Sequence, residues 1–156
     1  MDRYELCQKI VWNIDHVSEI ITQYQKQAHT YGGEKPLYMQ QVHTLALIGR
    51  NPGLNLNTLT SLTGRSKVTV SQQVSRLASL GFVTKNRNQD NQREVTLQLT
   101  PEGEKVFAFH EEDDHRFYRL LIDELGVFSD TDLELIDRFV TTLILAFKKD
   151  EENGLS

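Results

Sequence analysis

The sequence has only one cysteine, Cys7, so the chain cannot form an internal disulfide. It also lacks an apolar run near the ~20 residues needed to cross a bilayer, because its longest candidate, VTTLILAF, is far shorter. The N-terminal stretch MDRYELCQKI carries charge from its second residue and shows no apolar core of an export signal. We therefore expect a cytoplasmic protein without a membrane partner.

Enzymatic motifs are missing as well. There is no serine–histidine–aspartate spacing and no glycine-rich phosphate loop. The closest approach to a zinc-hydrolase motif is His110-Glu111 followed by His115, where the second histidine comes one residue too late. At about 100° per residue this step turns His115 roughly 140° away from His110. We expect no enzyme and no required cofactor.

The charges that are present are unevenly distributed. The chain has 156 residues, 38% of them apolar, which suits one globular core, and a net charge of −5. Residues 1–56 balance five acidic against five basic side chains, and residues 101–156 hold fifteen acidic against six basic. Residues 57–100 have only Asp90 and Glu94 against six basic residues, a net charge of +4: Arg65, Lys67, Arg76, Lys85, Arg87 and Arg93. A polyanion would meet the chain in this middle third.

Periodicity predicts one long amphipathic helix over residues 4 to about 29 and a second over residues 37–50. The first has the apolar stripe Leu6, Ile10, Ile14, Val17, Ile21 and Tyr24. Glycine and proline at residues 32–36 separate the two helices. The second is expected to face Tyr38, Val42, Leu45 and Ile48 inward and to end at Asn51-Pro52-Gly53.

The central segment predicts two helices around a tight turn, over residues 58–63 and 67–80. Asn57 and Ser66 are the expected N-caps, and Gly64 and Gly81 the expected permissive residues at the turn and after the second helix. Val70, Val74 and Leu77 should face inward. The stretches FVTKNRN and REVTLQL then predict two strands joined by a polar turn at residues 89–92.

Two further helices should follow this hairpin. Thr100-Pro101 starts one that runs to about Leu125, and Ser129 with Asp132 forms a capping box for the last one. In the last helix the apolar residues have near-heptad spacing: Leu133, Ile136, Val140, Leu143 and Phe147. The terminal helices carry more apolar surface than a small domain can cover, so we expect a homodimer.

The predicted fold is mainly α with a small β-hairpin wing, a winged helix-turn-helix flanked by long N- and C-terminal dimerisation helices. Residues 1–36 would form the N-terminal dimerisation helix and loop, 37–100 the DNA-binding part and 101–156 the C-terminal dimerisation helices. These parts are expected to make one compact chain and not independent domains.

The order of these parts resembles the MarR family of transcriptional regulators. The stretch GLNLNTLTSLTGRSKVTVSQQVSRLASLGFVTK is similar to the family's helix, serine-lysine turn and recognition helix, and DNQREVTLQLTPEG is similar to its wing and following helix. The family's wing usually has aspartate, any residue and arginine, and here Asn91 replaces the aspartate while Arg93 is retained. The resemblance implies double-stranded DNA as partner and residues 67–80 as the helix that enters the major groove.

The DNA-binding candidates divide into phosphate contacts and base contacts. Gln72 can address adenine bidentately and is favoured over Gln73 by periodicity, whereas Thr69 can equally serve as a capping residue. The full set of candidates is Ser66, Lys67, Thr69, Ser71, Gln72, Ser75, Arg76, Lys85, Arg87 and Arg93.

The resemblance also implies a small-molecule, metal or oxidant effector. His43, His110 and Asp114 fall where zinc-responsive members place ligands, although those members have histidine at the last position. Surface or core roles for these residues stay open. For Cys7 a redox role is the alternative to a buried structural role, which its neighbour Leu6 favours. Aromatic side chains could line an effector pocket or only a dimer core.

Two functions from different classes are compatible with the sequence. The first is an effector-responsive, DNA-binding transcriptional regulator, most simply a repressor, that binds a palindromic operator as a homodimer. The alternative is a winged-helix protein-interaction module without DNA readout, which the acidic C-terminal segment would suit.

Overall fold

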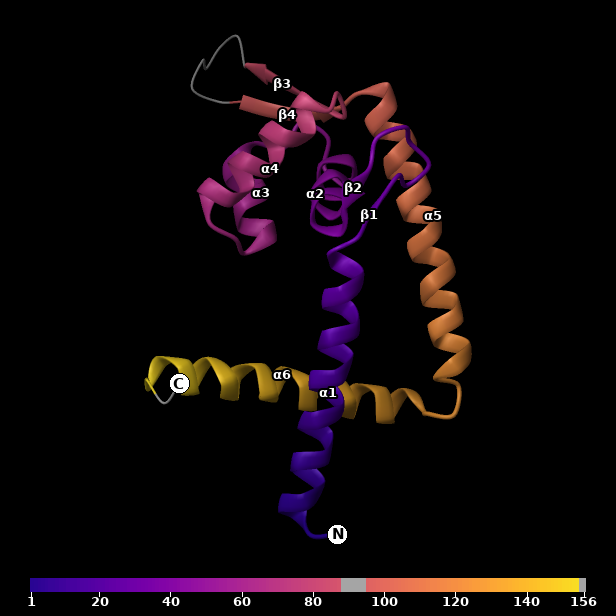
Figure 1. The fold of residues 1–156 in the computed structure, drawn as a ribbon, viewed down its shortest axis with the longest axis vertical. Helices are drawn as coiled ribbons and strands as arrows, with labels where there is room; N and C mark the ends of the chain where they lie inside the picture. Colours follow the sequence, from indigo (N-terminus) through magenta and orange to yellow (C-terminus); the bar gives the residue numbers. More distant parts are fainter. Residues whose placement is uncertain (88–94, 155–156) are drawn as a thin grey trace. The chain divides into compact units, whose positions relative to one another are not determined.

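The computed structural model describes residues 1–87 and 95–154, and its helices and the two strands of the wing follow the predicted order (Figure 1). Residues divide into two compact units, Met1–Asp113 and Asp114–Ser156, with the division inside a helix. Among the described residues, none of the helices combines the length and the apolar character that a bilayer crossing requires.

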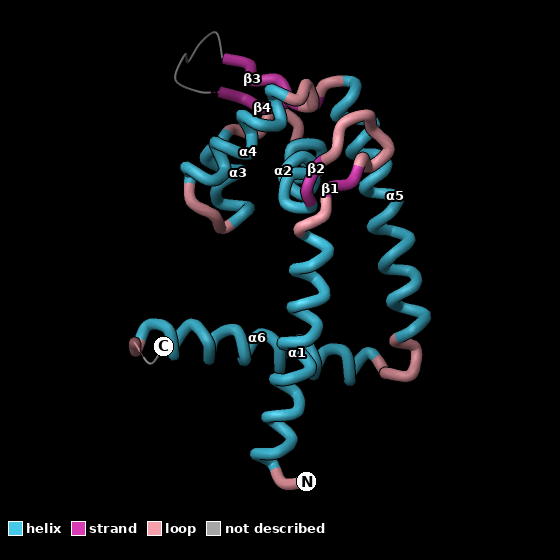
Figure 2. Tube along the Cα trace, viewed as in Figure 1, coloured by secondary structure: helices cyan, strands magenta, loops and turns pink. Residues whose placement is uncertain are grey.

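The first unit contains a winged helix-turn-helix, as the sequence predicts. Helices α2 (Met39–Arg50), α3 (Leu56–Thr63) and α4 (Lys67–Ser79) are followed by the antiparallel strands β3 (Val83–Arg87) and β4 (Val95–Leu99) (Figure 2). Val83 pairs with Leu99 and Arg87 with Val95. The predicted turn at residues 89–92, together with Arg93, lies outside the described residues.

The core of this unit joins the three helices to the wing. The predicted inward residues Val42, Leu45 and Ile48 of α2 are fully buried, and Phe82 at the start of the wing is buried with them. Burying each such side chain contributes roughly 1.5–3 kcal/mol. The cluster continues through α3, the inward face of α4 and the wing: Leu59, Val70, Val74, Leu77 and Leu97.

The N-terminal segment differs from the prediction. Helix α1 (Arg3–Gln25) ends earlier than residue 29, because Ala28–His29 forms strand β1, which pairs with β2 (Leu37–Tyr38). Tyr31 and Gly32 have positive φ angles of 47° and 72°, which reverse the chain between the two strands. Tyr38 precedes α2 at its N-cap position and is 50% exposed, so its predicted inward position is wrong.

The start of α3 is a second correction. Asn55, not Asn57, is its N-cap, and the Asn55 side chain accepts a hydrogen bond of 2.9 Å from the Thr58 amide. The reason is a tertiary contact: the Leu97 amide donates to the Leu54 carbonyl oxygen, and Asn55 forms a bridge with Thr96 of β4. This pairing keeps the chain extended as far as Asn55, so the helix begins at Leu56.

The last two helices have the predicted starts. Helix α5 (Pro101–Glu124) follows Thr100, and α6 (Asp130–Glu152) begins after Ser129, whose side chain forms the expected capping box with Asp132. Neither α1 nor α6 has a single buried residue in this chain, although both carry apolar stripes. The predicted division at residues 36/37 and 100/101 stays a prediction.

Candidate nucleic-acid interface

Helix α4 starts at a well-defined turn. Gly64 has a left-handed φ of 62°, and the Ser66 side chain accepts a hydrogen bond of 3.2 Å from the Thr69 amide, as predicted. The Thr69 hydroxyl also lies 2.8 Å from the Ser66 hydroxyl. The Thr69 side chain is therefore part of the cap. No acidic residue lies in the first turn, so the positive end of the helix dipole is available to a phosphate.

The outward face of α4 is polar and accessible. Opposite buried Val70 and Val74 lie Gln72 and Ser75, both exposed. Ser71 lies at the flank of the helix and is half-buried. The structure thus separates the two glutamines: Gln72 points to the surface and Gln73 lies against α2.

Gln73 belongs to a polar network that the sequence analysis missed. The Thr44 hydroxyl, in a side chain that is only 2% exposed, donates to the Gln73 side-chain oxygen over 2.9 Å. The Gln73 amide group and the Arg65 guanidinium both donate to the Gln40 side-chain oxygen, over 3.5 and 3.4 Å. This network, Gln40, Thr44, Arg65 and Gln73, joins α2 to the turn and to α4. The sequence signal for this network was Thr44, a polar residue on the inward face of α2.

Two lysines attach α4 to neighbouring segments. The Lys85 ammonium group of β3 donates to the Ser75 hydroxyl over 2.9 Å, which fixes the wing strand beside the outward face. Lys35, in the loop between β1 and β2, donates to the Leu80 carbonyl oxygen over 2.6 Å. A cation at the C-terminus of a helix interacts favourably with the negative end of the helix dipole. Both lysines therefore hold the C-terminal half of α4.

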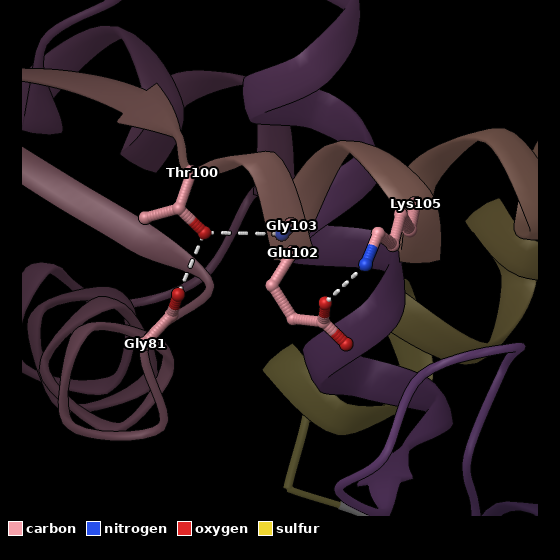
Figure 3. Close-up of polar contacts among 5 residues, drawn as sticks. All are labelled: Gly81, Thr100, Glu102, Gly103 and Lys105. Carbon is pink, nitrogen blue, oxygen red and sulfur yellow. Dashed lines mark hydrogen bonds and ion pairs between the residues drawn. The ribbon is translucent and has the colours of Figure 1, made fainter.

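The wing is attached to α5 at Thr100. Its hydroxyl donates to the Gly81 carbonyl oxygen over 2.6 Å and accepts from the Gly103 amide over 3.1 Å, so one side chain joins the end of α4 to the start of α5 (Figure 3). In the same turn Lys105 donates to Glu102. A Cβ atom at Gly103 would lie 2.1 Å from the Phe82 carbonyl oxygen, so only glycine permits this approach.

The cations of the interface are available to an anionic ligand. Lys67, Arg76 and Lys85 are exposed, and among the described residues none of them has a carboxylate within ion-pair distance. Arg87 is the last residue of β3. Arg93, the predicted wing contact, lies outside the described residues.

The effector candidates lie elsewhere in the first unit. The rings of His43 and His110 are 5.4 Å apart, and Tyr31 contacts His110 edge-on at 6.0 Å. Tyr31 also contacts His29, which stacks on Tyr24 of α1 at 5.0 Å. We call these five residues the aromatic column. It connects α1, the turn after β1, α5 and α2, and His110 is almost fully buried within it.

The metal and redox candidates receive less support. In the residues that the structure describes, no group of three or more histidine, cysteine, aspartate or glutamate side chains is placed to hold a metal ion. His43 and His110 are brought together, and Asp114 follows His110 by four residues in the same helix, α5. Cys7 is exposed in this single chain, where α1 has no buried residue, so the choice between a buried structural role and a redox role stays a prediction.

Comparisons with known proteins agree with this architecture. Residues 37–95 match the model described as the MarR family. This similarity to the MarR family covers the winged helix-turn-helix of the chain. The HTH-type transcriptional regulator YhjH of Bacillus subtilis is 31% identical to this chain over 80 residues, which are 51% of the chain and 46% of YhjH. The match thus spans about half the length of that relative.

Solved structures show the same fold over most of the chain. The zinc-responsive MarR family member ZitR of Lactococcus lactis has a TM-score of 0.72 at 15% identity, over 91% of this chain and 99% of ZitR. FabT of Streptococcus pneumoniae, in complex with DNA, has a TM-score of 0.65 at 18% identity, over 94% of this chain and 98% of FabT. The curated relatives YhjH and PchR of Bacillus subtilis are described as HTH-type transcriptional regulators, which agrees with the expectation of a regulator and not an enzyme.

Proposed function

We propose that this chain is a sequence-specific, DNA-binding transcriptional regulator, an effector-responsive repressor that binds a palindromic operator as a homodimer. The observation that carries the proposal is the outward face of α4. It is capped at Ser66, exposes Gln72 and Ser75, and is accompanied by cations that have no carboxylate partner in the described part of the chain. Such a helix suits the major groove, where its first residues meet base edges.

The positions of the side chains in α4 and the wing indicate which part of the DNA each would contact. Lys67 at the first turn of α4, Arg76 near its end and Lys85 on β3 are proposed to contact phosphates, together with Arg87. Gln72 is proposed as the main hydrogen-bonding base reader, with Ser71 and Ser75 beside it. Arg93 is proposed as the wing contact, on the strength of the family resemblance alone. Ser66 and Thr69 form the cap, which can present backbone N–H groups to a phosphate.

The homodimer is supported by the terminal helices. In α1, Val17 and Ile21 are 54% and 46% exposed, and in α6, Ile136 and Val140 are 44% and 40% exposed. A single chain leaves these apolar stripes in water, whereas a two-fold partner would present the same stripes in return. Two copies also give two recognition helices, as a palindrome requires.

The effector is proposed to act at the aromatic column. His29 has a buried Nε2 atom without a hydrogen-bond partner among the described residues, so this part of the column has an unused polar group. The column connects α1 to α2 and α5, so a ligand there would change the position of the dimerisation helices relative to the winged helix. A ligand shifts binding only if it favours one such arrangement over the other. Zinc is one probe, since two imidazoles lie together and a third ligand would have to come from elsewhere.

Selection of duplexes from a random pool tests the proposal, using the full chain with and without zinc. The expected result is a palindrome whose half-site centres are about 34 Å, one duplex turn, apart. If zinc acts at the column, it changes the affinity for this duplex and His110→Ala removes the change. Failure to enrich any duplex, or binding that is independent of salt, would favour the alternative of a protein-interaction module.

A further inference from the structure

Helix α4 carries an apolar side chain on its outward face. Val68 is 67% exposed. Among the described residues from Met39 to Leu99, only Leu62 and Val68 are large apolar side chains that are exposed. Leu62 lies on α3, so Val68 is the one on the helix proposed to enter the groove.

The position of Val68 follows from the helix geometry. At about 100° per residue, Val68 lies roughly 160° around the helix from buried Val70. Gln72 follows Val68 by one turn and Ser75 by two, at roughly 200° and 140° from Val70. Val68, Gln72 and Ser75 therefore form one ridge along the outward face, which we call the outward ridge.

Val68 is also the first member of this ridge, in the first turn of the helix. The N-terminal residues of a recognition helix are those that reach base edges. Its neighbour Thr69 is engaged in the cap through the Ser66 hydroxyl, at 2.8 Å. Of the first three residues of α4, Lys67 suits a phosphate and Thr69 is occupied, which leaves Val68 to meet the bases.

The chemistry of valine restricts what it can recognise. Its side chain neither donates nor accepts hydrogen bonds, and the apolar feature in the major groove is the C5-methyl group of thymine. A β-branched side chain has one preferred rotamer in a helix, so it loses little freedom on contact. We propose that Val68 contacts a thymine methyl group in each half-site and thereby determines specificity at that base pair. This inference rests on the proposed DNA-binding function.

Replacement of thymine by deoxyuridine tests the contact, because it removes only the methyl group. Each thymine of the selected duplex is replaced in turn, and the Kd is measured by fluorescence anisotropy for the wild type and for Val68→Ser. In the wild type, each half-site should contain one thymine whose replacement weakens binding about fourfold. This is the effect of losing one buried methyl group. Val68→Ser should bind the thymine duplex more weakly and should not distinguish it from the uracil duplex.

Gln72→Ala is the matched control on the same ridge, and it should keep the uracil effect while losing affinity. Val68→Ser should keep the wild-type thermal unfolding midpoint, because the side chain is exposed. If no single uracil replacement has an effect that Val68→Ser abolishes, the contact is refuted while DNA binding stands. If no duplex is selected at all, the proposed function fails and this inference fails with it.

Discussion

At the residue scale, Gly103 shows how one missing side chain fixes the junction between the wing and α5. The Phe82 carbonyl oxygen accepts a hydrogen bond from the Thr100 amide over 3.0 Å, and the same oxygen lies 2.1 Å from the place of a Cβ atom at residue 103. The obstacle is backbone and cannot rotate away. Thr100, which joins Gly81 to Gly103, depends on this approach (Figure 3).

Gly103→Ala should therefore lower the free energy of unfolding by about 1–3 kcal/mol. In an unobstructed helix the same change would stabilise by about 1 kcal/mol, so the sign of the effect is diagnostic. Urea denaturation measures it, with Glu104→Ala, an exposed neighbour in the same helix, as the control. A stabilised Gly103→Ala would contradict the close approach.

The capping box formed by Ser129 and Asp132 makes the stability of the start of α6 depend on pH. The Ser129 hydroxyl donates to Asp132 over 2.6 Å and the Ser129 amide donates over 3.0 Å, and these bonds lower the pKa of Asp132 from its ordinary value of 3.8. A lowered folded-state pKa means that the pair stabilises the helix start above about pH 3.8, and that this stabilisation is lost as the pH falls through the lower pKa.

Ser129→Ala removes the larger of the two causes, so the pKa of Asp132 should rise toward 3.8. Carboxyl carbon NMR during an acid titration measures this pKa, and Asp130, outside the capping box, provides the comparison in the same spectra. An Asp132 midpoint that Ser129→Ala leaves unchanged would show that the capping box does not form in solution.

At the scale of elements, the network of Gln40, Thr44, Arg65 and Gln73 holds α4 against α2. Apolar packing alone, through Val70 and Val74, leaves a helix free to slide by small amounts, whereas directional hydrogen bonds fix its register. The position of Gln72 on the outward face depends on Gln73 being held inward.

Thr44→Val keeps the shape of the side chain but removes its hydroxyl. We expect a loss of about 1 kcal/mol in the free energy of unfolding, because Gln73 loses its buried partner. The matched control is Thr142→Val, where the hydroxyl donates to the Arg138 carbonyl oxygen one turn back and has no second partner among the described residues. Equal losses in the two variants would assign the effect to the helix and not to the network.

Local signals explain which elements the sequence predicted correctly. Ser66, Gly64, Gly81 and Ser129 act on backbone atoms within a few residues, so their roles were predictable. The N-cap at Asn55 was not, since it depends on pairing with β4, some forty residues later in the chain.

The short pair β1 and β2 was missed because two-residue strands leave no alternating pattern. The candidate site likewise has features that local sequence signals predict and features that depend on tertiary contacts. The polarity of the outward face of α4 was predictable from periodicity, whereas Gln73 and Lys35 required the tertiary contacts of Thr44 and Leu80.

At the scale of the whole molecule, the proposed binding to a palindrome requires two copies of the chain. The apolar stripes of α1 and α6 have no partner within one chain among the described residues, and isolated helices of this kind gain most of their stability from packing. Dimerisation is therefore expected to be coupled to helix formation in both.

Ile21→Glu on α1 and, separately, Val140→Glu on α6 should shift the chain from dimer to monomer, because each places a charge in an apolar stripe. Sedimentation velocity measures the mass. Thr22→Glu adds the same charge beside Ile21 but off the stripe, and should stay dimeric. A wild-type chain that sediments as a monomer at micromolar concentration would contradict the proposed homodimer.

The distribution of charge gives the most direct test of the central claim, that α4 and the wing meet the DNA backbone. The slope of log Kd against log salt counts the phosphates contacted, and each lost contact lowers it by about 0.9. For the selected duplex, Lys67→Ala, Arg76→Ala and Lys85→Ala should each lower the slope by about 1.8, for two copies, whereas Lys9→Ala on α1 should not. Unchanged slopes and affinities in all three variants would contradict the account.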